Sequence, residues 1–445
     1  MSVIPLDEVI QLQYHAAALL IYAPVLAGSV GIAFQRLLSK LARVAWLSSP
    51  SARPVEETTA IAACLRAYGD WFYALAATQQ SWRGYLVHQL AIAENPLTQY
   101  VQSCEGAQIP EEWLAAAQQD LTHLQALAQG EAKISEWMMI LAVQGAGATW
   151  DGLRPVQVGA AHPLLAVFTD EATWAEQLPV LVEAYGQQGT GIVGQYLALR
   201  WQSGQLQGIR TPDPIRLVDL VGYERQQEAL LANTEALLAG SRALNVLLYG
   251  SRGTGKSALI KALLWEYCDR GLRLIEIAKA DLSQLPQIVE QVCDRTQKFI
   301  LFVDDLSFEA EEDSYKALKV VLEGNLTARP QNVVVYATSN RRHLIREFFD
   351  ERPRPSHADE IHAWDTVQEK LSLSDRFGLT LTFEPPDQPT YLQIVHHLAC
   401  QSHLELATDA LEFQALQWAT RQNGRSGRTA RQCIDYLLAQ QRRNP

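Results

Sequence analysis

The stretch YGSRGTGKSALIKALL, residues 249–264, constrains the fold of this 445-residue chain more than any other. Gly250, Gly255, Lys256 and Ser257 match the pattern G-x-x-x-x-G-K-[ST]. The apolar run LNVLLYG leads into the pattern, and a run with helical spacing follows it. A phosphate-binding P-loop requires this order of strand, glycine-rich loop and helix. We therefore expect an α/β domain built around such a loop.

The loop residues are the candidate phosphate ligands: Gly250, Ser251, Arg252, Gly253, Thr254, Gly255, Lys256, Ser257 and Ala258. Glycines let the backbone N–H groups turn inward around a phosphate. Lys256 is expected to reach the β- and γ-phosphate oxygens, and Ser257 to bind Mg²⁺. The loop thus predicts a nucleoside triphosphate with magnesium as the ligand.

Two adjacent acids, Asp304 and Asp305, end the apolar run in FILFVDDLSFE, residues 299–309. Ligands of parallel α/β sheets bind just outside the carboxyl ends of the strands. We expect the strand before Asp304 to neighbour the P-loop strand, with Asp304 holding the hydration shell of magnesium and Asp305 polarising the attacking water. The simpler alternative is that both acids only cap the strand.

The rest of the chain divides into three predicted domains. Residues 1–210 show apolar side chains at three- and four-residue spacing and predict an all-helical region. Pro212 and Pro214 mark a linker. Residues 216–387 alternate apolar strands with helical stretches, which indicates a parallel sheet, and residues 388–445 turn helical again. The predicted fold class is an α/β P-loop core preceded by an all-α domain and followed by a small helical lid.

Charge and composition restrict the partners. A net charge of −12 does not indicate nucleic-acid binding, although six arginines and one acid from Arg421 onward leave a local basic face open. The six cysteines form no C-x-x-C pair, so a reducing cytoplasm fits best. Residues 9–35 carry no Asp, Glu, Lys or Arg. Because this stretch is rich in Ala and Gly and contains polar residues, we expect a buried helix pair; a membrane-associated segment is the alternative.

Further motifs follow in an order that resembles the AAA+ ATPases, over residues 219–431. LVGYE, with Val221, Gly222 and Tyr223, resembles the segment that lines the adenine pocket. NVVVYATSN resembles the strand that ends in the sensor-1 residue, here Asn340. LSLSDRFGL resembles the segment that supplies an arginine finger, here Arg376. The resemblance implies ATP as the nucleotide and an oligomer in which the finger serves a neighbouring subunit.

The segment NGRSGRTARQCIDYL resembles the sensor-2 helix of the AAA+ lid. Arg428 is the expected sensor because it follows Gly427 at the start of the helix, and Arg425 and Arg431 are the alternatives. More narrowly, YGSRGTGKS, DDLSFE, ATSNRRHL and LSLSDRFG together resemble an uncharacterised bacterial family of predicted AAA+ ATPases.

Asp305 departs from the usual AAA+ pattern, in which Glu follows the magnesium-binding Asp; the replication-initiator and helicase-loader branch also uses Asp-Asp. The shorter side chain implies slow turnover. The resemblance implies a cytoplasmic, magnesium-dependent ATPase that remodels or loads a macromolecular partner chosen by the N-terminal domain. Two alternatives stay open: an ATP-dependent assembly switch or scaffold with little hydrolysis, and a small-molecule P-loop kinase.

Overall fold

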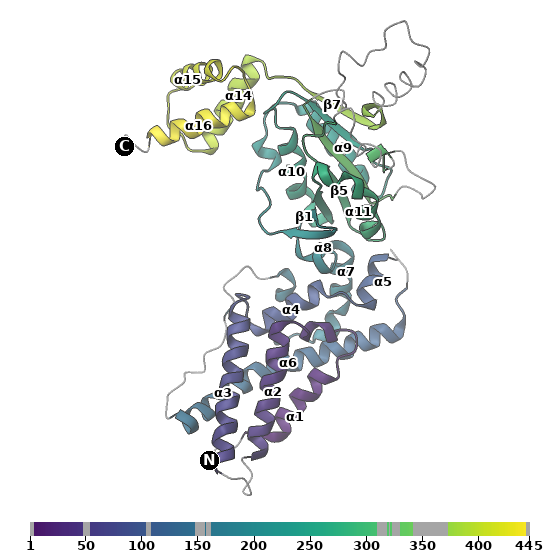
Figure 1. Cartoon of the computed structure of the whole chain (residues 1–445), viewed down its shortest axis with the longest axis vertical. Helices are drawn as coiled ribbons and strands as arrows, with labels where there is room; N and C mark the ends of the chain where they lie inside the picture. The colour runs from purple at the N-terminus through teal and green to yellow at the C-terminus, as the bar shows by residue number, and fades with distance from the viewer. Residues whose placement is uncertain are drawn as a thin grey trace, which may run out of the picture. The chain divides into compact units, whose positions relative to one another are not determined.

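The computed structural model describes residues 4–47, 54–103, 108–146, 156, 162–308, 318–319, 321–322, 330–340 and 373–441. Its contacts divide the chain into two compact units, which we call the helical unit (Met1–Gly194) and the sheet unit (Gln195–Pro445) (Figure 1).

The helical unit packs its helices around one apolar core. Its helices are α1 (Leu6–Ala17), η1 (Ala23–Leu26), α2 (Ser29–Leu47), α3 (Pro54–Ala76), α4 (Trp82–Ile92), α5 (Pro96–Ser103), α6 (Glu111–Ala146), η2 (Pro163–Ala166), η3 (Trp174–Gln177), α7 (Leu178–Gln188) and α8 (Gly191–Gln195). Helices α2 and α3 lie side by side (Figure 1). The rings of Phe34, Trp71 and Trp82 meet in the core, with the Phe34 and Trp82 centroids 4.3 Å apart.

The charge-free stretch 9–35 forms most of α1, all of η1 and the start of α2. Its Val9, Tyr22 and Phe34 side chains are fully buried in the apolar core. The prediction of a buried helix pair is therefore confirmed. Among the residues that the structure describes, no helix has the length and apolar character needed to cross a membrane.

A buried carboxylate fixes the loop that follows α1. Asp120, on α6, is fully buried and accepts hydrogen bonds from the backbone N–H groups of Leu20, Ile21 and Tyr22, at 2.7 to 3.0 Å. These three N–H groups lie outside any helix and need an acceptor. Asp120 supplies it and so joins α6 to the loop.

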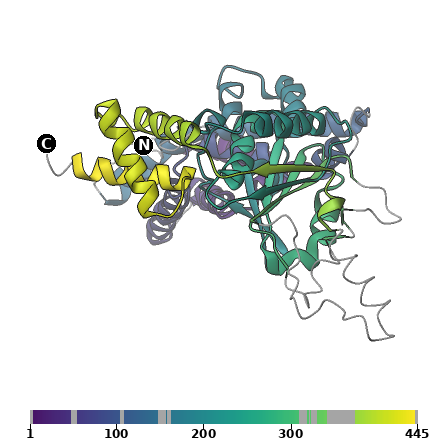
Figure 2. The same cartoon turned by 90° about the horizontal axis from the view of Figure 1, so that it is seen from above.

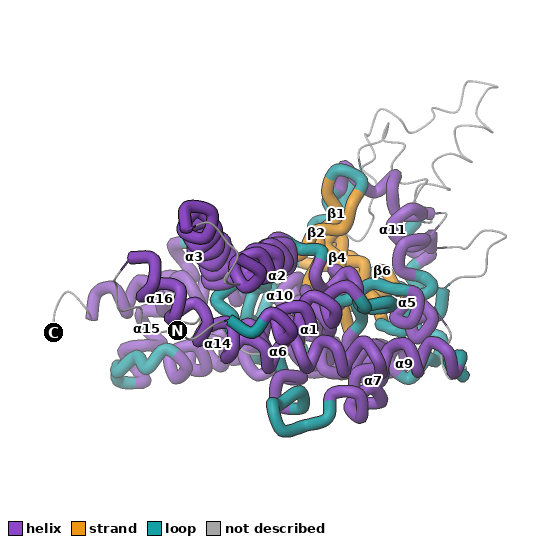
Figure 3. Tube along the Cα trace, turned by 90° about the horizontal axis from the view of Figure 1, so that it is seen from below, coloured by secondary structure: helices purple, strands orange, loops and turns teal. Residues whose placement is uncertain are grey.

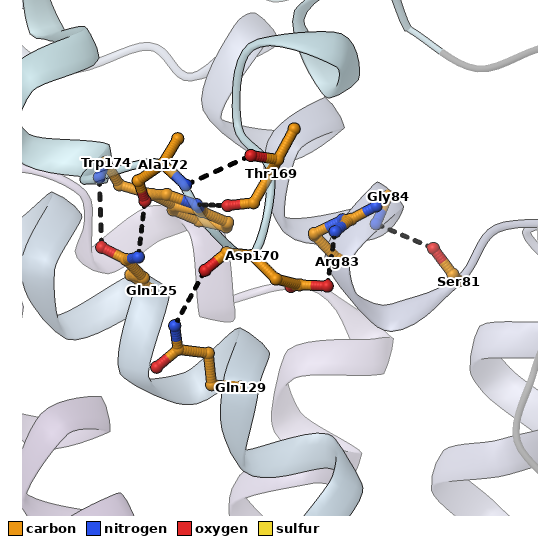
Figure 4. A network of polar contacts seen from close by, with 9 residues as sticks. All are labelled: Ser81, Arg83, Gly84, Gln125, Gln129, Thr169, Asp170, Ala172 and Trp174. Carbon is orange, nitrogen blue, oxygen red and sulfur yellow. Dashed lines mark hydrogen bonds and ion pairs between the residues drawn. The ribbon is translucent and has the colours of Figure 1, made fainter.

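A second polar network, drawn in Figure 4, holds the segment before η3 against α6. The Gln125 amide donates to the carbonyl oxygen of Ala172 at 2.7 Å and accepts from the backbone N–H of Trp174 at 3.1 Å. The Trp174 indole, itself fully buried, donates to the carbonyl oxygen of Thr169. An ion pair of 2.8 Å between Arg83 and Asp170 ties the same segment to α4.

The sheet unit contains a seven-stranded sheet with the order β2-β1-β4-β5-β6-β3-β7. The strands are β1 (Ala198–Gln202), β2 (Gln205–Ile209), β3 (Val246–Gly250), β4 (Leu272–Glu276), β5 (Lys298–Val303), β6 (Val333–Ser339) and β7 (Leu379–Phe383). All neighbouring pairs are parallel except β1 with β2. Strands β4 to β6 are buried almost throughout, and most of their residues are apolar; the charged Arg273 of β4 is buried as well.

One topological prediction is wrong. The strand that precedes Asp304, β5, does not neighbour the P-loop strand β3, because β6 pairs with both and lies between them. Strand adjacency in a parallel sheet depends on which crossover the helices make, and the spacing of two motifs along the chain does not encode it. Strand β6 therefore ends in the middle of the edge that carries the loop and the acids.

Helices cover both faces of this sheet. They include η4 (Leu217–Asp219), α9 (Glu224–Leu238), α10 (Lys256–Tyr267), η5 (Cys268–Arg270), η6 (Lys279–Gln284), α11 (Leu285–Val292) and η8 (Ser374–Arg376). Apolar residues of α9 and α10 share a core with alternate residues of β3 to β7. Figures 2 and 3 show α11 on the other side of the sheet from α9 and α10. This arrangement fixes α10, and with it the loop at its N-terminus, against the sheet.

The hairpin of β1 and β2 extends the sheet at one edge, where Ala198 of β1 pairs with Leu274 of β4. The predicted helical domain extends to residue 210, but the compact units divide between Gly194 and Gln195. The backbone pairing of β1 with β4 places the hairpin in the sheet unit. Each strand of the hairpin has only five residues, too few for the sequence pattern to separate it from the helical region before it.

Three further helices, α14 (Gln388–Gln401), α15 (Thr408–Arg421) and α16 (Gly427–Gln441), close the sheet unit. They enclose a small apolar core of their own. The Asp387 side chain caps α14 by accepting from the Thr390 backbone N–H. The predicted architecture is confirmed in the described residues: an α/β core with a mostly parallel sheet and a P-loop between β3 and α10, a helical region before it and a small helical domain after it.

Candidate nucleotide-binding site

The P-loop joins β3 to α10 through three glycines with positive φ: Gly250 at 142°, Gly253 at 76° and Gly255 at 90°. Residues with a side chain rarely adopt such values. At Gly250 a Cβ would also collide with the carbonyl oxygen of Phe383 on the neighbouring strand. The glycines of the motif are thus required by the backbone path, which turns the loop around the N-terminus of α10.

Lys256 is the first residue of α10, and its side chain folds over the loop. Its Nζ donates to the carbonyl oxygens of Gly250 at 2.9 Å and Ser251 at 2.6 Å. Burial lowers the pKa of the Lys256 ammonium from its usual value, while the nearby Asp304 and Asp305 carboxylates oppose that shift. The lysine therefore lies where a phosphate would take over from the two carbonyls.

Ser257 and Asp304 meet although they are far apart in sequence. The Ser257 hydroxyl donates to Asp304 Oδ1 at 2.6 Å. The same oxygen accepts the hydroxyl of Thr338, at the end of β6. The structure thus brings together the two residues that the sequence predicts as magnesium ligands.

Asp305 has a left-handed backbone, with φ of 51°. Asp and Asn adopt this region more readily than most residues. The Asn340 amide donates to Asp305 Oδ1 at 2.6 Å. The predicted sensor-1 residue therefore contacts the predicted water-orienting carboxylate directly.

All these groups face one cavity of about 640 Å³. Fourteen of the predicted site residues line it: Val221, Gly222, Tyr223, Arg252, Gly253, Thr254, Gly255, Lys256, Ser257, Ala258, Asp304, Asp305, Asn340 and Arg428. Gly250 and Ser251 are absent from the lining, but their carbonyl oxygens accept from Lys256. The cavity is large enough for a nucleotide.

One end of the cavity is mainly apolar, with Leu220, Val221, Ile394 and Leu398 in its lining. Tyr223 directly precedes α9 here; its ring packs on Phe383, and its hydroxyl donates to the carbonyl oxygen of Glu384. Burial raises the pKa of Tyr223 to about 12. This end suits a flat, weakly polar group such as a nucleobase.

The lid reaches the cavity through the N-terminus of α16. The Arg428 backbone N–H donates to the carbonyl oxygen of Gly253 at 3.3 Å. Arg428 and Arg431 both line the cavity. Arg425 instead donates to Gln388 at 3.2 Å and is absent from the lining. Two of the three candidate sensor arginines are thus at the site.

Arg376 ends the short helix η8, just before β7, and does not line this cavity. Its side chain is half-buried. Within one chain the structure therefore does not bring Arg376 to the other site residues.

The sequence did not identify several other residues that line the cavity: Ile215, Asp219, Leu220, Gln227, Leu259, Thr338, Phe383, Ile394, Leu398 and Gly427. Most are apolar side chains or belong to motifs whose backbone path could not be foreseen. Thr338 had a signal, because it stands two residues before Asn340 and alternation in a strand places i and i+2 on one face.

The oxygen ligands at the loop fit a magnesium ion, which prefers hydroxyl, carboxylate and phosphate oxygens to nitrogen or sulfur. No group of three or more His, Cys, Asp or Glu side chains in the described ranges could hold a metal alone. A magnesium ion held by Ser257 and Asp304 would leave positions in its shell for phosphate oxygens and water.

Comparison with solved structures finds partial likenesses. The Thermotoga maritima RuvB Holliday junction branch migration motor is 16% identical with a TM-score of 0.33, over 49% of this chain and 62% of that one. A DNA replication initiation factor is 19% identical with a TM-score of 0.33, over 51% of this chain and 64% of that one. The FIGL-1 AAA domain in complex with ADP is 20% identical with a TM-score of 0.36, over 52% of this chain and 76% of that one. The chain thus spans less than two thirds of the RuvB chain.

Comparison with curated proteins gives no match. A family model described as "Protein of unknown function (DUF815)" matches residues 194–441, which include the whole P-loop, both aspartates and the lid. Because this match covers more than half of the 445 residues, the chain belongs to the DUF815 family.

Proposed function

We propose that this protein binds ATP with Mg²⁺ and hydrolyses it. One observation carries the proposal. The Ser257 hydroxyl donates to Asp304 Oδ1 at 2.6 Å, and the hydrogen-bonded pair Asp305 and Asn340 lines the same cavity. A P-loop alone supports phosphate binding. The second carboxylate and its amide partner add a group that can orient water.

In this proposal each residue has one task. The loop N–H groups and the start of α10 hold the phosphates, and Lys256 leaves the two carbonyls to bind the β- and γ-oxygens. Ser257 and Asp304 would hold the magnesium ion, whose charge stabilises the phosphate oxygens. Asp305 accepts a hydrogen bond from the attacking water while Asn340 fixes its carboxylate. Arg428 or Arg431 contacts the phosphate from the lid.

We extend the proposal to the assembly and its use. Arg376 lies outside the cavity of its own chain and would act as an arginine finger on a neighbouring subunit. A homo-oligomer would then remodel or load a macromolecular partner, which residues 1–210 would bind. The core, residues 216–387, and the lid, residues 388–445, would form the motor, in the cytoplasm.

Phosphate release from ATP and Mg²⁺, without any added acceptor, tests the proposal. Lys256→Ala should abolish or severely weaken ATP binding, because it removes the cation inside the phosphate cradle. Lys261→Ala is the matched control: it lies on the same helix, pairs with Asp213 at 3.4 Å and is outside the cavity lining.

Each result separates the proposal from its alternatives. Tight binding with no turnover would indicate an assembly switch or scaffold. Transfer only to an added acceptor would indicate a kinase. Equal ATP affinity and turnover in wild type and Lys256→Ala would mean that the loop is not the working site.

A further inference from the structure

We infer that Thr338 is a positioning residue that fixes both aspartates of the magnesium site. The inference rests on the proposed function and assigns a role to a side chain that the sequence-based prediction of the site did not include. Thr338 lies near the end of β6 and is 2% exposed. Strand β6 lies between β3, which carries the P-loop, and β5, which carries the aspartates. This topology brings one hydroxyl to the centre of the site.

The hydroxyl contacts both acids at once. A carboxylate only accepts, so Thr338 Oγ1 donates to Asp304 Oδ1, at 2.5 Å. The same oxygen accepts the backbone N–H of Asp305 at 2.9 Å. A hydroxyl offers one donor and two acceptor sites, so both bonds form together. One side chain thus orients the Asp304 carboxylate and anchors the Asp305 backbone.

For Asp304, the Thr338 hydroxyl is the side-chain donor that would remain when magnesium binds; the backbone N–H of Asp305 also donates to the same oxygen, at the longer distance of 3.2 Å. Oδ1 also accepts the Ser257 hydroxyl at 2.6 Å, but Ser257 would turn its oxygen toward the ion. The Thr338 hydroxyl has no such second task. It therefore keeps the carboxylate from rotating away from the metal shell.

For Asp305, the Thr338 bond supports an uncommon backbone. The φ of 51° lies in the left-handed region, which costs energy unless neighbouring groups hold it. Thr338 holds the backbone N–H and Asn340 holds the carboxylate. Thr338 lies near the end of β6 and Asn340 directly follows the strand, so both reach Asp305 from the same segment. Together they aim Asp305 toward the cavity.

Two substitutions separate positioning from packing. Thr338→Val keeps the shape and removes the hydroxyl, whereas Thr338→Ser keeps the hydroxyl and removes a methyl group. If Thr338 only packs the core, the Ser variant should be the worse of the two. If Thr338 positions the acids, Thr338→Val should weaken magnesium-dependent nucleotide binding more than Thr338→Ser does. Thr338→Ser should nevertheless lower the melting temperature at least as much as Thr338→Val.

The readout is the affinity of a fluorescent ATP analogue with Mg²⁺ and in EDTA. In Thr338→Val, affinity with Mg²⁺ should fall about 10-fold or more, since loss of a residue that supports a metal ligand typically costs about 10- to 100-fold. Affinity in EDTA should stay within about threefold of wild type. Turnover should fall similarly, and Thr338→Ser should restore both. Thr338→Ala replaces Thr338→Val if the latter does not fold.

The inference is overturned if Thr338→Val binds Mg-ATP as wild type does, or if Thr338→Ser is equally impaired. It is also overturned if the loss is the same in EDTA, because the hydroxyl would then serve the loop as a whole. If the wild-type protein does not bind ATP, the proposed function itself is refuted. The wild-type binding measurement therefore separates that failure from a failure of the inference about Thr338.

Discussion

At the scale of single residues, two side chains of the proposed site, Lys256 and Asp305, form hydrogen bonds within the protein without any ligand. Lys256 donates to two carbonyl oxygens of its own loop, and Asp305 accepts from Asn340. Neither polar group is left unsatisfied, which would cost about 1 to 3 kcal/mol in a buried place. Both side chains therefore have partners without a ligand, and in the proposed function a nucleotide would take over the bonds of Lys256.

Asp305→Asn tests the role of the second acid. The amide keeps the size of the side chain and tolerates the left-handed backbone, but it cannot accept a proton or polarise water as a carboxylate does. We expect ATP affinity to stay within about threefold of wild type while turnover falls by about 10²-fold or more, the usual contribution of a positioned acid or base. Isothermal titration and phosphate release measure the two effects.

A collapse of binding in Asp305→Asn would assign Asp305 to the metal and exchange the roles of the two aspartates. Asp375→Asn is a suitable control, because Asp375 is exposed and does not line the cavity. It should leave affinity for ATP unchanged.

At the scale of elements, α6 organises the helical unit through buried polar contacts. Asp120 holds the loop after α1, and Gln125, one and a half turns further along, holds the segment before η3 (Figure 4). Both contacts satisfy backbone groups in places where no helix or sheet can. Side chains of α6 therefore hold both of these segments.

Asp120→Ala should destabilise the protein. It leaves the N–H groups of Leu20, Ile21 and Tyr22 without their acceptor, and Tyr22 is fully buried. We expect the free energy of unfolding to fall by about 2 kcal/mol or more, within the range for unsatisfied buried donors bonded to a charged group. Urea denaturation followed by far-UV circular dichroism measures it.

The matched control for this change is Glu136→Ala, which removes an exposed acid from the same helix. Its effect should stay within about 0.5 kcal/mol. An equal loss in both variants would show that Asp120 contributes only helix propensity or charge.

These elements also show how far the sequence predicts the structure. The motif at 249–264 predicts the strand, the loop and the helix in order because its glycines and apolar spacing act locally. The order of β3, β6 and β5 depends on long-range crossovers, and so the adjacency prediction was wrong. The same reason explains why Asp219 and Ile394 could not be foreseen in the cavity. Their side chains belong to no motif and reach the site only through the tertiary fold.

At the scale of the whole molecule, the residue predicted to complete the site, Arg376, does not line the cavity of its own chain. Arg376→Ala should bind ATP normally, because every phosphate and magnesium contact within the chain remains. Turnover should fall by about 10³-fold or more if the arginine is an essential finger. Nucleotide affinity and phosphate release, measured on the same preparation, check this.

Mixing two inactive variants gives the sharper measurement. Arg376→Ala subunits keep an intact P-loop, and Lys256→Ala subunits keep an intact finger, so a mixed assembly contains some complete interfaces. Activity should reappear on mixing. Full activity of Arg376→Ala alone would remove this residue from the mechanism. Mixed assemblies, verified by mass, that recover no turnover would count against action across a subunit boundary.

The cavity collects residues from the beginning and the end of the sheet unit, from Ile215 to Arg431. During synthesis the P-loop and both aspartates leave the ribosome before α16, which carries Arg428 and Arg431 and is the last cavity element to be made. A nascent chain can therefore fold its sheet around an incomplete pocket, and the proposed nucleotide site is complete only once the Arg428 backbone N–H has reached the carbonyl oxygen of Gly253. In a newly made molecule, tight nucleotide binding would mark the end of folding.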